Sequence, residues 1–241
     1  MSTILLKFAS PLQSWGTNSH FNIRHTDPHP SKSAVIGMLA AALGYRRDQD
    51  EEIQELNKLD FAVRTDQIVG ITKDFQIARH EYIEKNVYLT DRYYLEDSIF
   101  LLAISSQDES MMDKIEYGLK NPYFQLFLGR RSVPINADFF VERNELGPIE
   151  NLRTYPWLAS DWYKNRYPTI SLSIFADGDL IEDQDSILSR QMRRDRVLSF
   201  SQKERIFKDR QEVRIDLKKE KESTTSQDQD TDHDIFGSVK E

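Results

Sequence analysis

The sequence predicts an α+β protein in which a ferredoxin-like unit, with the architecture of an RNA-recognition motif, precedes a smaller, mostly β lobe. Strand-like and helix-like segments follow the order β-α-β, then β-α-β, over residues 1–130, which is the ferredoxin-like order. An insertion at about residues 70–97 separates the middle two strands, where that fold needs only a short connection. Residues 131–215 form the second lobe in this prediction. Fold class alone predicts no function.

The first strand and the first helix give the clearest signals. Apolar side chains at Ile4, Leu6 and Phe8 alternate along the chain, which is the period of a strand. Residues 32–43 are apolar on almost every side, which predicts a largely buried helix. Gly44 suits the position that ends this helix, because glycine adopts positive φ without strain.

Weaker signals place the remaining elements. Short apolar runs predict strands, and the helix that starts after Asp108 has a good capping residue. We expect a helix at 51–58, strands at 61–64 and 98–105, a helix from Asp108 to Asn121-Pro122, strands at 123–128, 169–175 and 212–215, and a loop-like segment at 144–168.

The start of the first helix has an unusual chemistry. Pro30-Ser31-Lys32-Ser33 offers hydroxyls, a cation and free backbone N–H groups, but no carboxylate. A helix start normally favours Asp or Glu, and this one has the makings of a site for an external anion. The alternative is an ordinary serine cap beside a solvated lysine. The segment by itself does not separate the two interpretations.

The insertion at 70–97 is rich in aromatic and basic residues. Tyrosine and arginine together stack on bases and pair with phosphates, so this composition favours a functional loop. The residues concerned are Arg79, His80, Tyr82, Lys85, Tyr88, Arg92, Tyr93 and Tyr94.

Composition bounds the function classes. The 241 residues carry a formal net charge of −8 and no cysteine, which excludes disulfides and thiolate metal sites and fits a cytoplasmic protein. No apolar run is long enough to span a membrane, and the N-terminus does not resemble a signal peptide. Much of the acidity lies in a polar tail, residues 216–241, that we expect to be disordered. A basic stretch at 190–214 precedes the tail.

Five short motifs, in this order and spacing, resemble the CasD family, the fifth-numbered Cas subunit of type I-E CRISPR Cascade complexes and a member of the RAMP superfamily. The resemblance covers residues 4 to about 134 and weakly extends to about 214. The motifs are Gln13-Ser14-Trp15-Gly16, Arg24-His25-Thr26, Pro30-Ser31-Lys32-Ser33, Arg92-Tyr93-Tyr94-Leu95-Glu96-Asp97 and Leu128-Gly129-Arg130-Arg131-Ser132.

The resemblance implies a non-catalytic RNA-binding subunit that acts in antiviral defence. Its ferredoxin-like palm, with the 70–97 insertion as a thumb, would hold the 5′ handle of the CRISPR RNA. It would cap a filament of CasC-type backbone subunits, contact the Cascade large subunit, and meet target DNA only indirectly, since guide pairing reads the target. No cofactor, metal or membrane contact is implied. The implied RNA-binding residues are Gln13, Trp15, Arg24, Thr26, Ser31, Lys32, Ser33, Arg92, Tyr94, Arg130 and Arg131.

The main alternative is a metal-independent endoribonuclease that processes CRISPR repeat RNA. Such an enzyme needs a general base near a 2′-OH, and His25, His29, Lys32 and Tyr82 are the candidates. The interpretation we favour is that these histidines are loop residues that line a binding surface. A P-loop is absent, and five histidines without cysteine give no zinc spacing. Trp15 also has a second interpretation, as a core anchor after the first strand.

Overall fold

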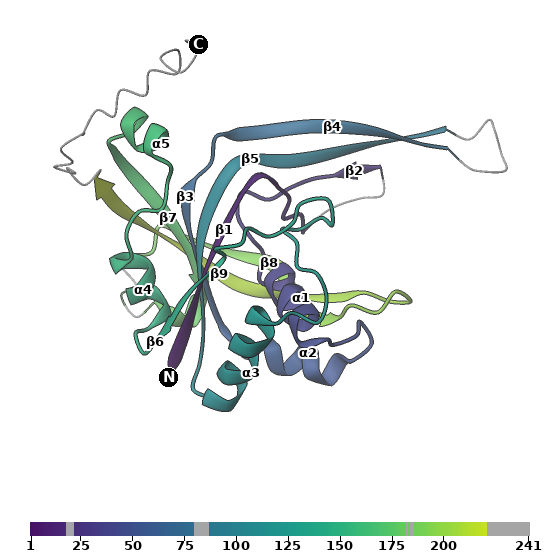
Figure 1. The fold of residues 1–241 in the computed structure, drawn as a ribbon, viewed down its shortest axis with the longest axis horizontal. Helices are drawn as coiled ribbons and strands as arrows, with labels where there is room; N and C mark the ends of the chain where they lie inside the picture. Colours follow the sequence, from purple (N-terminus) through teal and green to yellow (C-terminus); the bar gives the residue numbers. More distant parts are fainter. Residues whose placement is uncertain (18–21, 80–86, 182, 184–185, 221–241) are drawn as a thin grey trace, which may run out of the picture.

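The protein has a mixed α/β fold built on one antiparallel sheet. The computed structural model describes residues 1–17, 22–79, 87–181, 183 and 186–220. Seven strands follow the order β6-β1-β5-β3-β7-β9-β8 (Figure 1), and each neighbouring pair is antiparallel. Their bounds are β1 Ser2–Gln13, β3 Asp60–Gln67, β5 Val87–Ser106, β6 Phe140–Asn144, β7 Thr169–Asp177, β8 Ser189–Ser199 and β9 Ile206–Glu220.

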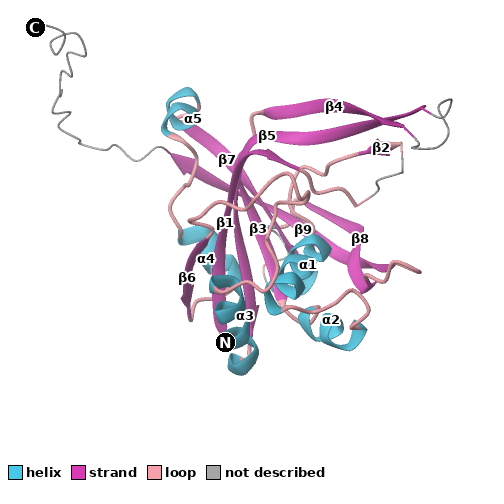
Figure 2. Ribbon diagram, turned by 45° about the vertical axis from the view of Figure 1, so that its right-hand side comes forward, coloured by secondary structure: helices cyan, strands magenta, loops and turns pink. Residues whose placement is uncertain are grey.

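Helices cover both faces of this sheet (Figure 2). One apolar core forms between the sheet and α1, α2 and α3, and a second core packs α4 against the opposite face. The helices are α1 Lys32–Leu43, α2 Asp50–Leu56, α3 Glu109–Lys120, α4 Pro148–Thr154 and α5 Asp161–Arg166, with a short 3₁₀ turn at Gly178–Leu180. The predicted bounds of α1 are confirmed, with Ser31 as its N-cap and Gly44 at φ +81° after its end.

The strand predicted at 123–128 is wrong. The backbone N–H groups of Tyr123 and Phe124 donate to the carbonyls of Ala42 and Ala41, so this segment satisfies the end of α1 instead of joining the sheet. The position beside β1 is taken by β6, in a register that pairs Leu5 with Glu142. The edge strand therefore comes from a segment for which the sequence predicted no strand.

The residues predicted as a separate lobe, 131–215, do not form a sheet of their own. β7 pairs with β3, and β9 and β8 extend the same sheet beyond it. The predicted strands at 169–175 and 212–215 are confirmed within β7 and β9, whereas β8 was missed. The loop-like segment at 144–168 contains α4 and α5, both too short to give a clear sequence period.

An arm projects from the top of the sheet in Figure 1. We use this name for β4 (Gly70–Arg79) and the part of β5 that pairs with it, Val87–Glu96. β2 (Ile23–Arg24) runs parallel to β5 beside the base of the arm. The residues predicted at the tip, among them Tyr82, lie outside the described residues. The arm lies within residues 70–97, for which the sequence predicted a long loop, and its described residues form a paired hairpin.

The first residues predicted to belong to the disordered tail, 216–220, form the end of β9. β9 continues to Glu220, because Leu217 pairs with Leu172 of β7 and Glu220 pairs with Thr169. Residues 221–241 lie outside the described residues. Within the part of the chain that the structure describes, no helix has the length and apolar character needed to cross a membrane.

Candidate nucleic-acid interface

The start of α1 is completed by a carboxylate from a distant strand. The Ser31 side chain accepts from the backbone of Ala34, and the backbone N–H of Lys32 donates to Asp195 Oδ2 at 2.9 Å. Lys32 is only 6% exposed, and its ammonium pairs with Asp177 at 2.8 Å. An internal anion thus occupies the helix start that the sequence analysis considered as a site for an external anion. The contact of Ser31, Lys32 and Ser33 with RNA stays a prediction. The burial of these three residues does not support it.

Asp195 belongs to a buried ionic network. Arg210 donates to both of its carboxylate oxygens, at 2.8 and 2.9 Å, and also contacts Asp177 and Glu212. Breaking such a network is costly, because a buried charge loses its partner. The network joins β8 and β9 to the loop that precedes α1, and so fixes the residues that follow β2.

Gln13 and Trp15 lie in the core. The Gln13 amide donates to the carbonyls of Phe8 and Ser98, and its oxygen accepts from Trp15 Nε1 at 3.1 Å. Trp15 is 3% exposed and stacks on Phe8 at 5.6 Å between ring centroids. Both side chains are therefore buried, and Trp15 packs in the core as its second interpretation expected. Their predicted RNA contact has no exposed side chain to make it.

Three arginines from separate motifs meet beside the base of the arm. Arg24 pairs with Arg92 in the parallel register of β2 and β5. Arg130 donates to the carbonyls of Arg24 and Tyr93, and its guanidinium lies over the Tyr94 ring at 4.4 Å. Burial lowers the pKa of Arg130, and the positive charges of Arg92 and Arg24 lower it further. We name Arg24, Arg92 and Arg130 the guanidinium cluster.

Arg92 has no anionic partner in this cluster. Its Nε is buried and makes no hydrogen bond. The neighbouring Asp91 pairs instead with Lys73 at 2.8 Å, and Asp74, which lies opposite Arg92 in the register, accepts from Gln76. Like charges on paired strand positions are unfavourable, and a buried donor without an acceptor costs free energy. Among the described residues, no carboxylate forms an ion pair with the three guanidinium groups of the cluster, although Asp74 lies on the strand position opposite Arg92.

Backbone contacts hold the segments of the cluster together. Ser14 Oγ donates to the Tyr93 carbonyl at 3.1 Å, and the Trp15 N–H donates to Thr26 Oγ1 at 2.9 Å. Gly129 has φ +85°, and a Cβ there would lie 1.7 Å from the Ser14 carbonyl oxygen. Only glycine allows this approach. The predicted residue Thr26 is thus a positioning residue, placed to fix the loop that presents Arg24.

The two candidate histidines of the loop differ in exposure. His25 is exposed and stacks on Tyr93 at 5.3 Å, beside the guanidinium cluster. His29 is buried, stacks on Phe175, and contacts Arg193 through Nδ1 at 2.8 Å. Burial lowers the pKa of His29, against the hydrogen bond with Glu212 that raises it. The part of the chain that the structure describes contains no group of three or more potential metal ligands.

The arm has an apolar face of its own. Alternate residues of β4 lie on one side of the hairpin, and Leu89 lies opposite Ile77 in the register. The large exposed side chains there are Ile71, Phe75, Ile77 and Leu89, of which Phe75 is 63% exposed. A two-stranded ribbon with an uncovered apolar face is marginally stable alone in water. The ion pair of Lys73 and Asp91 lies on the same face and separates Ile71 from the other apolar residues. Exposed apolar groups of this kind mark contact surfaces.

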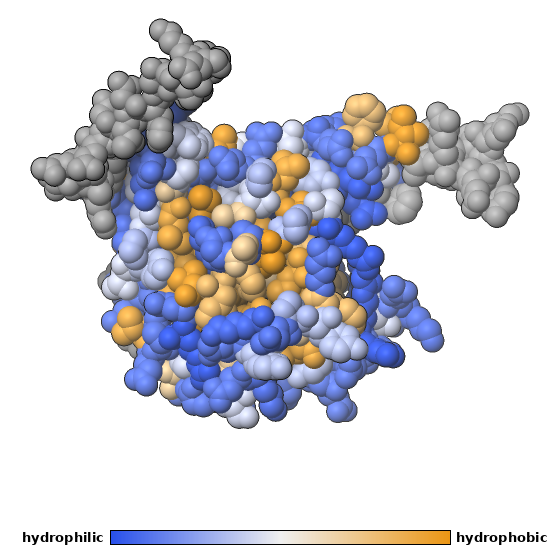
Figure 3. Space-filling model, viewed as in Figure 1, coloured by the Kyte–Doolittle hydropathy of each residue, from blue (hydrophilic) through white to orange (hydrophobic). Residues whose placement is uncertain are grey.

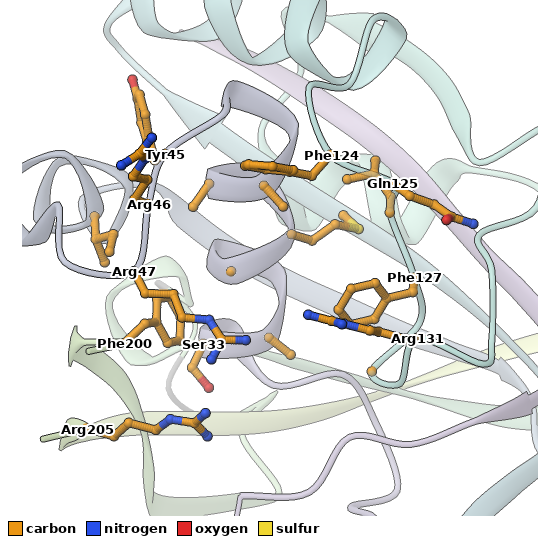
Figure 4. Close-up of a pocket in the computed structure, with 18 residues that line it drawn as sticks. Ser33, Tyr45, Arg46, Arg47, Phe124, Gln125, Phe127, Arg131, Phe200 and Arg205 are labelled. Carbon is orange, nitrogen blue, oxygen red and sulfur yellow. The ribbon is translucent and has the colours of Figure 1, made fainter. Parts of the chain in front are cut away.

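Arg131 lies outside the guanidinium cluster. It follows Arg130 directly but lines a groove along α1 (Figure 4). The sequence analysis named Arg24, Arg92, Arg130 and Arg131, but it did not predict that the first three lie together. It missed Asp177 at the end of β7, and also Asp195 on β8 and Arg210 on β9, two buried residues that each lie between exposed neighbours.

The chain is similar to CRISPR-associated proteins in sequence and in overall structure. The sequence model of the family described as CRISPR-associated protein (Cas_Cas5) matches residues 3–212. The CRISPR system Cascade subunit CasD of Escherichia coli (strain K12) is 28% identical over 191 residues, which cover 70% of this chain and 83% of that protein. A chain of a solved CRISPR RNA-guided surveillance complex is 27% identical, with a TM-score of 0.72 and 90% of both chains covered. A crystal structure of a Cas protein is 29% identical, with a TM-score of 0.63 and coverage of 89% and 94%.

Proposed function

The chain belongs to the CRISPR-associated Cas5 family, and from that premise we propose that it is a non-catalytic, RNA-binding subunit of a type I-E Cascade surveillance complex in the cytoplasm. Its similarity to a Cascade subunit and to a chain of a surveillance complex supports this proposal. In this role it holds the 5′ handle of the CRISPR RNA and caps one end of the CasC-type backbone filament. It contacts the Cascade large subunit and meets target DNA only through the complex.

The observation that carries the proposal is the guanidinium cluster, whose three side chains form no ion pair with a carboxylate among the described residues. Phosphate oxygens accept from arginine in pairs of charge-assisted hydrogen bonds. A single strand of RNA would supply the acceptor that Arg92 Nε lacks, and its negative charge would relieve the repulsion between Arg24 and Arg92. The exposed His25–Tyr93 stack lies beside this position and offers an aromatic surface to an unpaired base.

The fold suggests how the subunit divides its tasks. We assign the ferredoxin-like palm to β1, α1, β3, β5, α3 and β6, whose strands follow the order β6-β1-β5-β3. The arm is the thumb. Its apolar face is the surface for a neighbouring backbone subunit, and its base carries Arg92 toward the RNA. Burying Phe75 and Ile77 against a partner would stabilise a ribbon that has little support of its own.

Few of the candidate general bases are accessible to an RNA substrate. Among the four candidate bases, His29 and Lys32 are buried and ion-paired or hydrogen-bonded within the protein. Tyr82 lies outside the described residues. His25 is the one exposed candidate beside the guanidinium cluster, and it is the residue that the endoribonuclease alternative requires.

A nuclease assay separates these functions. The purified chain is incubated with CRISPR repeat RNA, with and without Mg²⁺, and the RNA length is followed. We expect uncut RNA under both conditions. Cleavage at one position that disappears in His25→Ala protein would replace the proposal by the endoribonuclease alternative.

Binding is tested in the assembled complex. The chain is co-expressed with its neighbouring subunits and CRISPR RNA, and RNA retention is measured against salt concentration. Each phosphate contact contributes about 0.7 to the slope of log K against log salt for a single strand. The triple variant Arg24→Ala/Arg92→Ala/Arg130→Ala should therefore lower the slope by about 2.

The matched control removes equal charge from the other side of the molecule. Arg153, Lys164 and Arg166 lie on α4 and α5 and are exposed or half-buried. Their triple alanine variant should keep the wild-type slope. Equal slopes for the cluster variant and this control would remove the guanidinium cluster from the RNA path.

A further inference from the structure

A groove runs along the exposed side of α1. It has a cavity volume of about 720 Å³ and extends from Ser33 at the start of the helix to Tyr45 beyond its end. Small residues of α1 form its floor, namely Ala34, Gly37 and Ala41. Figure 4 shows aromatic side chains on both sides of the helix, with Phe200 on one side and Phe127 and Phe124 on the other. Figure 3 shows apolar residues gathered at the centre of the molecular face on which α1 lies, bordered by hydrophilic residues.

Four guanidinium groups surround this apolar floor. Arg46 and Arg47 follow α1, Arg131 comes from the turn after Gly129, and Arg205 from the turn before β9. All four are exposed, and their side chains form no ion pair with a carboxylate among the described residues. The described lining of the groove contains no Asp or Glu. In a chain of net charge −8, this concentration of unpaired positive charge selects an anionic occupant.

The groove is continuous with the guanidinium cluster through a single turn. Arg130 faces the cluster, where it contacts Tyr94, while Arg131 lines the groove. Gly129 lies between the two sites, is exposed, and also lines the groove. An extended ligand that leaves the guanidinium cluster would pass over Gly129, which has no side chain, before it reaches the apolar floor of the groove.

The acidic tail of this chain is a poor occupant, because its attachment point is distant. β9 starts at Ile206, next to the groove residue Arg205, and runs away from it to Glu220. Fifteen strand residues at about 3.3 Å each span roughly 50 Å. The acidic run 228–234 follows Glu220 by eight to fourteen residues, a reach of at most about 29 to 50 Å. Only a fully extended chain would bring its last residues to the groove.

We infer that this groove holds an unpaired nucleotide of the same RNA that the guanidinium cluster binds, an inference that rests on the proposed function. The base lies on the small-residue floor of α1 between the aromatic side chains, and the flanking phosphates pair with Arg131 on one side and Arg47 or Arg205 on the other. Planar bases stack on aromatic rings and on guanidinium planes alike. The groove thus supplies both kinds of contact that single-stranded RNA uses, one step beyond the cluster.

Two variants test the groove in the assembled complex with CRISPR RNA. Arg131→Ala/Arg205→Ala removes two phosphate contacts, and should lower the slope of log K against log salt by about 1.4. Ala41→Trp fills the floor without changing charge, and should weaken RNA retention about tenfold at an unchanged slope, since it excludes the base. The control is Arg153→Ala/Arg166→Ala, an equal loss of charge on the opposite side, which should match wild type. Circular dichroism of each variant verifies that it is folded.

A cross-linking measurement identifies the occupant directly. A photoreactive benzoylphenylalanine replaces Arg47 at the edge of the groove, and the cross-linked product is analysed. We expect attachment to one nucleotide position of the CRISPR RNA. Attachment to another protein subunit, with RNA retention unchanged in the two groove variants, would overturn the inference in favour of a protein docking site.

The design also separates this inference from the proposed function. If the groove variants retain RNA like their control while the Arg24/Arg92/Arg130 variant loses it, the groove inference is wrong and the RNA-binding function stands. If the Arg24/Arg92/Arg130 variant also retains RNA like the wild type, the groove inference and the proposed RNA-binding function of the cluster are both wrong.

Discussion

Arg92 is held in the free protein at a cost in free energy, which a bound phosphate group would remove. Its Nε is buried without an acceptor, and Arg24 lies beside it on the neighbouring strand. A buried donor that lacks its partner costs about 1–3 kcal/mol. Replacing Arg92 by Met keeps an apolar stem of similar shape and removes both the orphan donor and the charge. The variant should therefore be more stable than the wild type when RNA is absent.

The size of the effect follows from these terms. At about 2–4 °C per kcal/mol for a chain of this length, a gain of about 1–3 kcal/mol raises the Tm by about 2 to 12 °C. Arg92→Lys serves as the matched control, because lysine keeps the charge but has no donor at the depth of Nε. The increase in Tm of the Arg92→Lys variant should persist in high salt, because it comes from removing the unpaired donor. The additional gain of the Met variant, which comes from removing like-charge repulsion, should shrink as salt screens it.

Thermal unfolding of the full chain measures these effects, followed by RNA retention in the complex. The stabilised Met variant should retain less RNA, since stability has been exchanged for a binding residue. Inorganic phosphate should raise the Tm of the wild type more than that of the variant, because a ligand stabilises the state that binds it. A Met variant that is less stable than wild type and retains RNA equally well would refute this reasoning.

Three other perturbations address the scaffold. Asp195→Asn should lower the free energy of unfolding in urea by about 3–5 kcal/mol, because Arg210 and the Lys32 N–H lose a buried anion; a loss no larger than that of the more exposed Asp216→Asn, under about 1 kcal/mol, would show that α1 needs no internal carboxylate. Truncation after Glu220 should leave Tm and complex assembly unchanged, whereas truncation after Asp216 removes pairs between β9 and β7 and should lower the Tm; loss of assembly after the shorter deletion would assign a docking role to the tail. Burial lowers the pKa of His29 below 6.5 in the folded protein, so as the pH falls the imidazole is protonated in the unfolded chain before it is protonated in the folded one. The free energy of unfolding should therefore decrease as the pH falls below about 6.5. His29→Asn should weaken this pH dependence, and an equal dependence in both proteins would show that His29 is not its source.

The sequence by itself determined the local elements and the family. The alternation at Ile4, Leu6 and Phe8 predicted β1, and the cap at Ser31 with Gly44 predicted both ends of α1, because strand and helix periods and caps depend on near neighbours. The order and spacing of five short motifs were enough to indicate the family. Local chemistry was sufficient for these conclusions.

Tertiary structure alone decided which residues share a surface. Lys32 reads as a free cation in the sequence, but Asp177 and Asp195, more than a hundred residues away, bury and pair this helix start. For Arg92, the chain neighbours Asp91 and Glu96 suggest a surface ion pair, but Asp91 pairs with Lys73, and the sheet register places Arg92 between Arg24 on β2 and Asp74 on β4. A charge interacts with whatever lies within a few ångströms, and chain distance does not set that separation. The grouping of Arg24, Arg92 and Arg130 therefore required the sheet register and the approach of Gly129 to Ser14.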